Sequence, residues 1–225
     1  GAYATSVLAN LEPNISVATI PWSFTSYQQA REVIDSTGGE YYAKMLAGKG
    51  ITYLGSFHNG FRQLTNSVRP VTKPGDLKGL KIRVPGSAVY MSTFKALGAN
   101  STAMSWSEVF TAIQQGTIDG QENGCSITKS AKMDEIQKYM TIWNYSYEND
   151  LFVANTKIWE SLEENTRQLI QECAAEACDW GRDQLEADEA ALIQGFRDAG
   201  MQVDELTEEQ LSAFQAAVSD VIEEF

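Results

Sequence analysis

The sequence predicts an α/β protein that forms either one large domain or two small lobes, and three features of the chain bear on this prediction. Between residues 76 and 123, three strand patterns alternate with two helix patterns, as in a parallel sheet with right-handed crossovers. Residues 58–79 are polar and rich in Gly and Pro, so we expect a connector that crosses between lobes. Near the C-terminus, a helical pattern of roughly 38 residues would be about 57 Å long, which exceeds the width of a small lobe.

The region before the connector combines short strands with an interrupted helix. We expect residues 1–25 to be strand and turn material, in which a buried strand end is closed by Pro21. Residues 26–48 have a helical pattern that a Gly-Gly pair interrupts, and residues 51–57 have the pattern of a strand.

The alternating run begins with LKIRVP, in which apolar residues alternate with Lys and Arg and Pro85 ends the strand. Ser87 is a suitable N-cap for a helix that ends at Gly98. Ser105 and Glu108 fit a capping box at the start of a second helix. The remaining elements expected here are a strand over 101–104, the end of the second helix at Gly116, and a strand over 117–123.

The long C-terminal helix has a predicted start and few breaks. Ser161 and Glu164 have the spacing of another capping box, and no Pro occurs before the helix ends near Gly200. Apolar residues keep a roughly helical spacing along it. Gly181 is the position at which a kink would shorten it.

Charge and composition exclude several classes of partner. The net charge is −13; residues 1–156 carry 13 Lys and Arg against 12 Asp and Glu, whereas residues 157–225 carry 4 against 18. An acidic chain disfavours nucleic acid and anionic membranes as partners, and the acidic end is interpreted as a solvated helical surface. No apolar run approaches the ~20 residues that span a bilayer, and residues 1–22 lack the pattern of a signal segment.

The three cysteines do not predict a disulfide framework. Cys173 and Cys178 are five residues apart on a predicted helix and therefore point to different faces, which makes a bridge between them unfavourable. We expect all three cysteines to be buried small apolar residues.

The sequence offers little catalytic machinery. His58 is the only histidine, so no imidazole cluster can bind zinc, and we expect this residue on the surface or in a loop. No nucleotide-binding or nucleophile motif is present. Asp119 and Glu122 could form an acid–base pair, although a hinge or surface position is the preferred interpretation. We therefore expect no catalytic residue, no metal and no cofactor.

Four residues are candidates for ligand binding. Arg83, Trp106 and Asn123 follow successive strands, so they are expected at one edge of the sheet, where open α/β sheets bind ligands. An arginine there could bind a carboxylate through two parallel hydrogen bonds, or it could be an exposed strand residue in an ion pair. Trp106 could be a ligand wall or a packing residue, and Asn123 a donor or a turn residue. Arg62, in the connector, is open to both interpretations.

These segments resemble a known family. DLKGLKIRVPGS, FKALGAN, WSEVFTAIQQGTIDGQEN and EIQKYM are similar to the solute-binding proteins of tripartite ATP-independent periplasmic (TRAP) transporters, which include dicarboxylate and sialic-acid receptors. The resemblance spans nearly the whole chain and is densest over 60–139. It implies that Arg83 clamps the ligand carboxylate, that Arg62 and Asn123 add hydrogen bonds, and that Trp106 is the aromatic residue of the site.

The resemblance also implies a type II-like periplasmic binding protein fold, with hinge strands and a long lobe-spanning helix. Four ranges follow: 1–59 in lobe I, 60–146 in lobe II, 147–190 returning to lobe I with most of the long helix, and 191–225 as a helical segment against lobe II. Family members have a signal peptide and a strand–helix–strand–helix unit before the segment equivalent to Gly1, so lobe I is expected to be incomplete here. The proline that usually follows DGQEN is replaced by Gly124 and Cys125.

The expected function is that of an extracytoplasmic, periplasmic receptor, acting as a monomer, that binds a small organic acid and delivers it to membrane permease subunits. C4-dicarboxylates, uronates and other sugar acids, and 2-oxo or hydroxy acids all satisfy one carboxylate clamp. Two other classes stay open. One is an enzyme acting on sugar acids on the same scaffold, and the other is a ligand-sensing domain of a signalling system.

Overall fold

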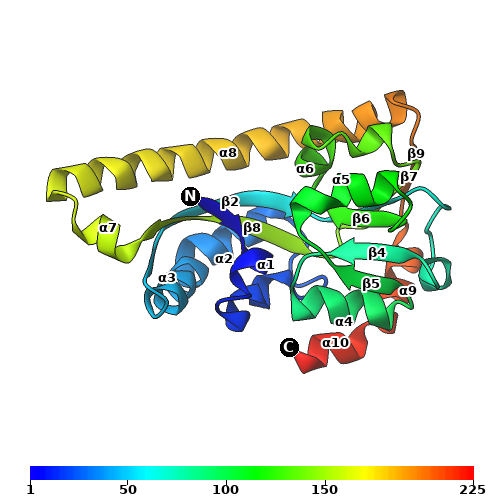
Figure 1. The fold of residues 1–225 in the computed structure, drawn as a ribbon, viewed down its shortest axis with the longest axis horizontal. Coiled ribbons are helices and arrows are strands. Elements are labelled where there is room, and N and C mark those ends of the chain that lie inside the picture. Colours follow the sequence, from blue (N-terminus) through cyan, green and yellow to red (C-terminus); the bar gives the residue numbers. More distant parts are fainter.

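A computed structural model describes all residues, 1–225, and contains two β-sheets joined by crossing segments (Figure 1). The smaller sheet has the order β1-β8-β2, formed by Ala2–Ala4, Tyr147–Asn155 and Ile51–Phe61, and both of its pairings are antiparallel. The larger sheet has the order β5-β4-β6-β3-β7-β9. Its strands are β3 Gln63–Asn66, β4 Lys81–Val84, β5 Asn100–Ala103, β6 Gly120–Asn123, β7 Tyr139–Ile142 and β9 Gln202–Glu205.

The alternating run from β4 to β6 confirms the sequence prediction. β4 pairs in parallel with both β5 and β6, and the helices between them are α4 (Ala88–Ala96) and α5 (Trp106–Gln114). Both helices end where Gly98 and Gly116 adopt positive φ angles, as expected of glycine after a helix. Ser87 and Ser105 are the N-cap residues of these helices, as predicted, but neither side chain accepts a hydrogen bond from its helix, so the capping box at Ser105 does not form.

The N-terminal region differs from the expectation of strand and turn. Only β1 is a strand; α1 (Thr5–Leu8) and a 3₁₀ helix (Pro13–Thr19) follow, and no strand ends at Pro21. Pro13 lies at the first helical position, where a missing N–H costs nothing. The interrupted helix is confirmed. It consists of α2 (Tyr27–Val33), a π-helical turn (Ile34–Gly38) and α3 (Gly39–Ala47).

The segment interpreted as a connector does cross between the sheets, but its first part is strand and not loop. β2 continues to Phe61 and β3 begins at Gln63, so the chain crosses from the small sheet to the large one around Arg62. The polar Gln63 side chain can be buried there because its amide oxygen and its amide nitrogen both have hydrogen-bond partners in the protein. Its Oε1 accepts from Trp143 N and Asn144 N at 3.0 and 3.1 Å, and its Nε2 donates to Phe61 O at 3.2 Å. These bonds tie the first crossing to the second one, between β7 and β8.

The long helix is α8 (Glu164–Asp198), a 35-residue helix of about 52 Å with no break at Gly181. It packs on β2 of the small sheet and on α6 and β9 of the large-sheet side, so it runs along both (Figure 1). Its N-cap is Glu163, and no capping box forms. Ser161 instead closes the preceding helix α7 (Thr156–Glu160).

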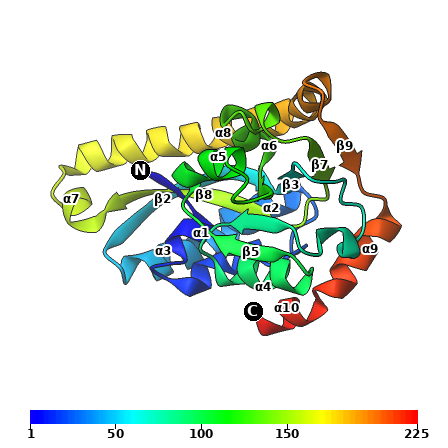
Figure 2. The ribbon, with the colours of Figure 1, turned by 45° about the vertical axis from the view of Figure 1, so that its right-hand side comes forward.

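Each sheet has its own apolar core. The larger core lies beside the six-stranded sheet and includes Phe94, Trp143 and Phe214, whereas Leu46 and Leu151 belong to the smaller core. Figure 2 shows α9 and β9 at the outer edge of the large sheet, with α10 against α4. The remaining elements are α6 (Cys125–Ser130), α9 (Glu208–Ala217), α10 (Ser219–Glu224) and 3₁₀ turns at Pro74–Leu77 and Met133–Glu135.

Two further expectations concern the cysteines and the membrane. Cys125 and Cys178 are buried as expected, but Cys173 is exposed because it lies on the outer face of α8; all three are free thiols. None of the helices combines the length and the apolar composition that a bilayer crossing requires.

Candidate functional site

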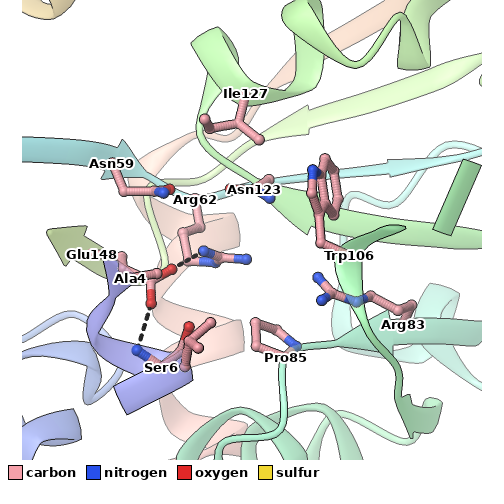
Figure 3. Close-up of a pocket in the computed structure, with 11 residues that line it drawn as sticks. Ala4, Ser6, Asn59, Arg62, Arg83, Pro85, Trp106, Asn123, Ile127 and Glu148 are labelled. Carbon is pink, nitrogen blue, oxygen red and sulfur yellow. Dashed lines mark hydrogen bonds and ion pairs between the residues drawn. The ribbon is translucent and has the colours of Figure 1, made fainter. Parts of the chain in front are cut away.

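The four residues singled out from the sequence line one cavity of about 190 Å³ between the two sheets (Figure 3). Residues from β1, α1, β2 and β8 form one side, and residues from β4, β6, α5 and α6 form the other. The lining consists of Ala4, Ser6, Val7, Asn59, Arg62, Arg83, Pro85, Trp106, Asn123, Ile127 and Glu148.

Arg83 is a buried cation without a carboxylate partner. Its side chain projects from β4, the residue is 4% exposed, and no Asp or Glu forms a salt bridge with it. Nε and Nη2 donate to the carbonyl oxygen of Met104 at 2.9 and 2.8 Å, which leaves Nη1 without a protein acceptor. Burial lowers the pKa of Arg83 to about 10, so the guanidinium remains protonated at neutral pH.

Arg62 reaches the same cavity, but its donors are mostly engaged. Nε donates to Glu122 Oε2 at 2.5 Å, and Nη2 donates to Glu122 O at 2.7 Å and Oε1 at 2.9 Å. Nη1 also donates to Glu148. These two buried carboxylates hold the pKa of Arg62 well above its usual range despite its burial. A guanidinium has five N–H groups, so one of them is left for a ligand.

Trp106 and Asn123 complete the large-sheet side of the cavity. Trp106 is the first residue of α5, and its ring lies against the Arg83 guanidinium, with 5.4 Å from Cζ to the ring centroid. Asn123 is the last residue of β6, and its Oδ1 accepts from Gly124 N at 3.0 Å. The Asn123 Nδ2 group therefore remains available as a donor.

Sequence reasoning missed two polar residues on the opposite side, Asn59 and Glu148. Both are buried in strands of the small sheet. Glu148 accepts from Ser6 N at 2.9 Å in addition to its bond from Arg62. The run Glu148–Asn149–Asp150 within an otherwise apolar strand was the available signal, because buried polar residues require partners.

Two surface positions considered for polar residues are wrong. Glu122 is not on the surface; it is fully buried between Arg62 and the hydroxyl of Tyr145. His58 is 4% exposed, with its ring nitrogens 2.7 Å from Tyr147 Oη and 3.0 Å from Glu186 Oε1 of α8. Both residues are buried because distant segments supply their hydrogen-bond partners.

Two α/β units joined by crossing strands, with a cavity that contains an unpaired guanidinium between them, have the arrangement found in proteins that bind a small ligand in a cleft. The whole chain, residues 1–225, matches the family described as bacterial extracellular solute-binding protein, family 7. The chain belongs to this family, whose description is that of binding proteins rather than enzymes.

Three similar proteins illustrate the family. The 2,3-diketo-L-gulonate-binding periplasmic protein of Escherichia coli is 33% identical over 95% of this chain and 65% of its own length. The C4-dicarboxylate-binding periplasmic protein of Rhodobacter capsulatus is 32% identical over 94% of this chain and 63% of its own length. A TRAP periplasmic solute-binding protein from Ralstonia eutropha, solved with bound (S)-2-acetolactate, is 31% identical with a TM-score of 0.96 over 99% of this chain and 73% of that one. The chain spans less than two thirds of the length of these curated relatives.

Proposed function

We propose that this chain is the ligand-binding part of an extracytoplasmic receptor for a small organic acid. The observation that carries the proposal is the buried guanidinium of Arg83, which faces a cavity and has no carboxylate partner in the protein. An unpaired buried charge is costly, and a ligand carboxylate would compensate it through a charge-assisted hydrogen bond.

The neighbouring groups suit the same ligand. The Trp106 ring supplies a flat apolar wall beside the guanidinium, against which the carbon skeleton can pack. The free amide group of Asn123 and the remaining N–H of Arg62 are further donors that a carboxylate can accept. The cavity is smaller than the ~300–1,000 Å³ typical of drug-sized ligands, which favours a short acid.

The proposed receptor works by closing two lobes on the acid, as a monomer in the periplasm, and delivers the acid to the permease subunits of a TRAP-type transporter. Family membership supports this role, and the relatives' names include sugar-acid and dicarboxylate receptors. We place the division between the lobes at residues 59–60 and 146–147. The crossings at Arg62 and between β7 and β8 support these boundaries.

The test is a comparison of Arg83→Ala with the unmodified protein. Organic acids are first screened by thermal shift, because a bound ligand raises the apparent stability. The affinity of the best acid is then measured by calorimetry, and we expect Arg83→Ala to weaken it roughly 100-fold. Arg197→Ala, which removes a partly exposed arginine paired with Glu205 at the C-terminal end of α8, is the matched control and should bind normally. Equal affinity in the Arg83→Ala variant would overturn the proposal.

A further inference from the structure

The large-sheet side of the cavity carries hydrogen-bond donors that have no acceptor in the protein. Arg83 has five N–H groups, and only two of them donate within the protein, both to the carbonyl oxygen of Met104. The Asn123 Nδ2 group donates to no protein atom. Arg83 Nη1 and Asn123 Nδ2 keep accessible surface, since neither is among the buried polar atoms without a partner. These N–H groups already outnumber the roughly four acceptor positions of one carboxylate.

Trp106 adds a further donor beside them. The residue is partly buried and lines the cavity, and its Nε1 forms no hydrogen bond in the protein, yet this atom is not a buried one. Figure 3 shows the nitrogen on the edge of the ring that faces Asn123. The Arg83 guanidinium lies over the same ring, with 5.4 Å from Cζ to the centroid. A group attached close to the ligand carboxylate can therefore accept from the indole N–H.

The side-chain oxygens on the opposite side are not free to bind a ligand donor. Glu148 is fully buried and accepts from Arg62 and from the backbone N–H of Ser6. The Asn59 Oδ1 atom is buried within the protein. A ligand group that only accepts hydrogen bonds therefore matches the cavity better than a group that also donates.

The charges of the cavity indicate that this accepting group is neutral. Glu122 and Glu148 both pair with Arg62, so Arg83 is the only cation left for a ligand. One carboxylate on the ligand compensates Arg83. A second carboxylate would enter the cavity without a free cation, which is unfavourable.

We propose that Trp106 Nε1 donates a hydrogen bond to a keto oxygen on the carbon next to the ligand carboxylate, so that the site selects a 2-oxo acid over the alkanoate of the same length. This inference rests on the proposed carboxylate receptor. A 2-oxo acid carries one carboxylate for Arg83 and, on the adjacent carbon, a neutral oxygen that only accepts. The alkanoate leaves the indole N–H without an acceptor, and a site built to bind a polar group rejects the analogue that lacks it.

Three pairs of acids test the preference by calorimetry. Pyruvate with propanoate, 2-oxobutanoate with butanoate, and 2-oxopentanoate with pentanoate each differ only in the keto oxygen and have the same charge. We expect the 2-oxo acid to bind at least about tenfold more tightly than its alkanoate in the pair whose length fits the cavity. Alkanoates that bind as tightly as their 2-oxo counterparts, or no binding by any of the six acids, would overturn the inference.

The variant Trp106→Phe assigns the preference to the indole N–H, because it keeps an aromatic ring and removes the donor. The 2-oxo acid should lose about tenfold in affinity, whereas the alkanoate should change little, which also shows that the variant is folded. Trp180→Phe, the same substitution at an exposed position of α8, is the matched control and should leave both affinities unchanged. An equal loss for both acids in Trp106→Phe would mean that the ring acts only as a wall and would overturn the role of Nε1.

A nuclear magnetic resonance titration observes the N–H directly. The protein has five tryptophans, and the indole N–H signal that disappears in Trp106→Phe identifies that of Trp106. This signal should shift clearly with the 2-oxo acid and much less with the alkanoate; equal shifts would contradict the hydrogen bond. These results are separable from the receptor proposal, which fails only if binding of the acids found by thermal shift is unaffected by Arg83→Ala.

Discussion

Arg62 and Arg83 are both buried at one cavity, yet their surroundings give them different roles. Arg62 is held by two carboxylates, Glu122 and Glu148, and its ring neighbour Tyr90 lies 5.0 Å from Cζ. Arg83 has only a backbone carbonyl as acceptor. The first arginine therefore contributes chiefly to folding at the crossing between the sheets, and the second is available to a ligand.

Replacement of Arg62 by Met should reduce stability far more than the same change at Arg83. Arg62→Met leaves two buried carboxylates without a cation, which costs about 3–5 kcal/mol in the free energy of unfolding. Arg83→Met removes an unpaired buried charge and should leave stability unchanged or raise it. Urea unfolding measures both. The triple variant Arg62→Met, Glu122→Gln and Glu148→Gln should recover most of the loss; equal stabilities of the two single variants would contradict this assignment.

The candidate site was predictable in part. Strand spacing and the family resemblance predicted that Arg83, Trp106 and Asn123 share one site, and they line one cavity. The prediction was possible because these residues belong to one regular unit of the chain. The side of the cavity formed by the small sheet was not predictable, since Asn59 and Glu148 come from strands paired across almost ninety residues of sequence. A polar residue in a strand shows its burial only when its distant partners are known.

The contact between β2 and α8 depends on buried polar groups as well as on apolar packing. His58 lies in β2 where the register with β8 shifts between His58 and Gly60, and its ring bridges Tyr147 and Glu186. Burial lowers the pKa of His58 to about 4, although the adjacent Glu186 opposes this shift. The neutral imidazole is therefore the form that fits between the sheet and the helix.

The variant His58→Gln should lose less stability on acidification than the unmodified protein. The pKa of His58 is lower in the folded protein than in the unfolded chain. Its contribution to stability is therefore complete above the unfolded pKa of 6.5 and is lost as the pH falls toward the folded pKa of about 4. Between about pH 7.5 and 5 the loss amounts to roughly 2 kcal/mol, which the variant should not show. Urea unfolding at both pH values measures it.

Asp150 provides the opposite control for this experiment. Burial, assisted by Glu148, raises the pKa of Asp150 to about 6, so its ionisation costs stability at higher pH and this cost is relieved as pH falls through 6. Asp150→Asn should therefore steepen the acid loss of stability. Parallel pH profiles for His58→Gln and the unmodified protein would show that His58 has no part in it.

At the scale of elements, regular patterns were predicted well and polar strands were not. The alternating run from β4 to β6 and the single helix α8 followed from apolar periodicity. The end of β2 and all of β3 were assigned to a connector because their residues are polar and contain Gly60. In the structure these polar groups are satisfied by cross-strand bonds, such as those of Gln63, so burial does not require apolar residues there.

The net negative charge of the molecule lies in residues that do not line the cavity. The net charge of −13 resides almost entirely in residues 157–225, which include α8. At the cavity itself, Glu122 and Glu148 both pair with Arg62, and Arg83 has no carboxylate partner. The field that an approaching anion meets at long range is therefore repulsive, and attraction begins only within the cavity, where Arg83 lies.

This charge distribution predicts that salt accelerates the binding of an organic acid. Because salt screens interactions beyond about 10 Å at 0.1 M, raising NaCl from about 10 to 300 mM should increase the association rate constant roughly two- to fivefold. The stopped-flow change in tryptophan emission, to which Trp106 contributes because it lies against Arg83, reports the binding step. The variant Glu172→Gln with Glu176→Gln, both exposed on α8, should bind slightly faster at low salt and depend less on salt. An association rate that falls as salt rises would mean that the protein attracts the anion from a distance, as a basic surface does.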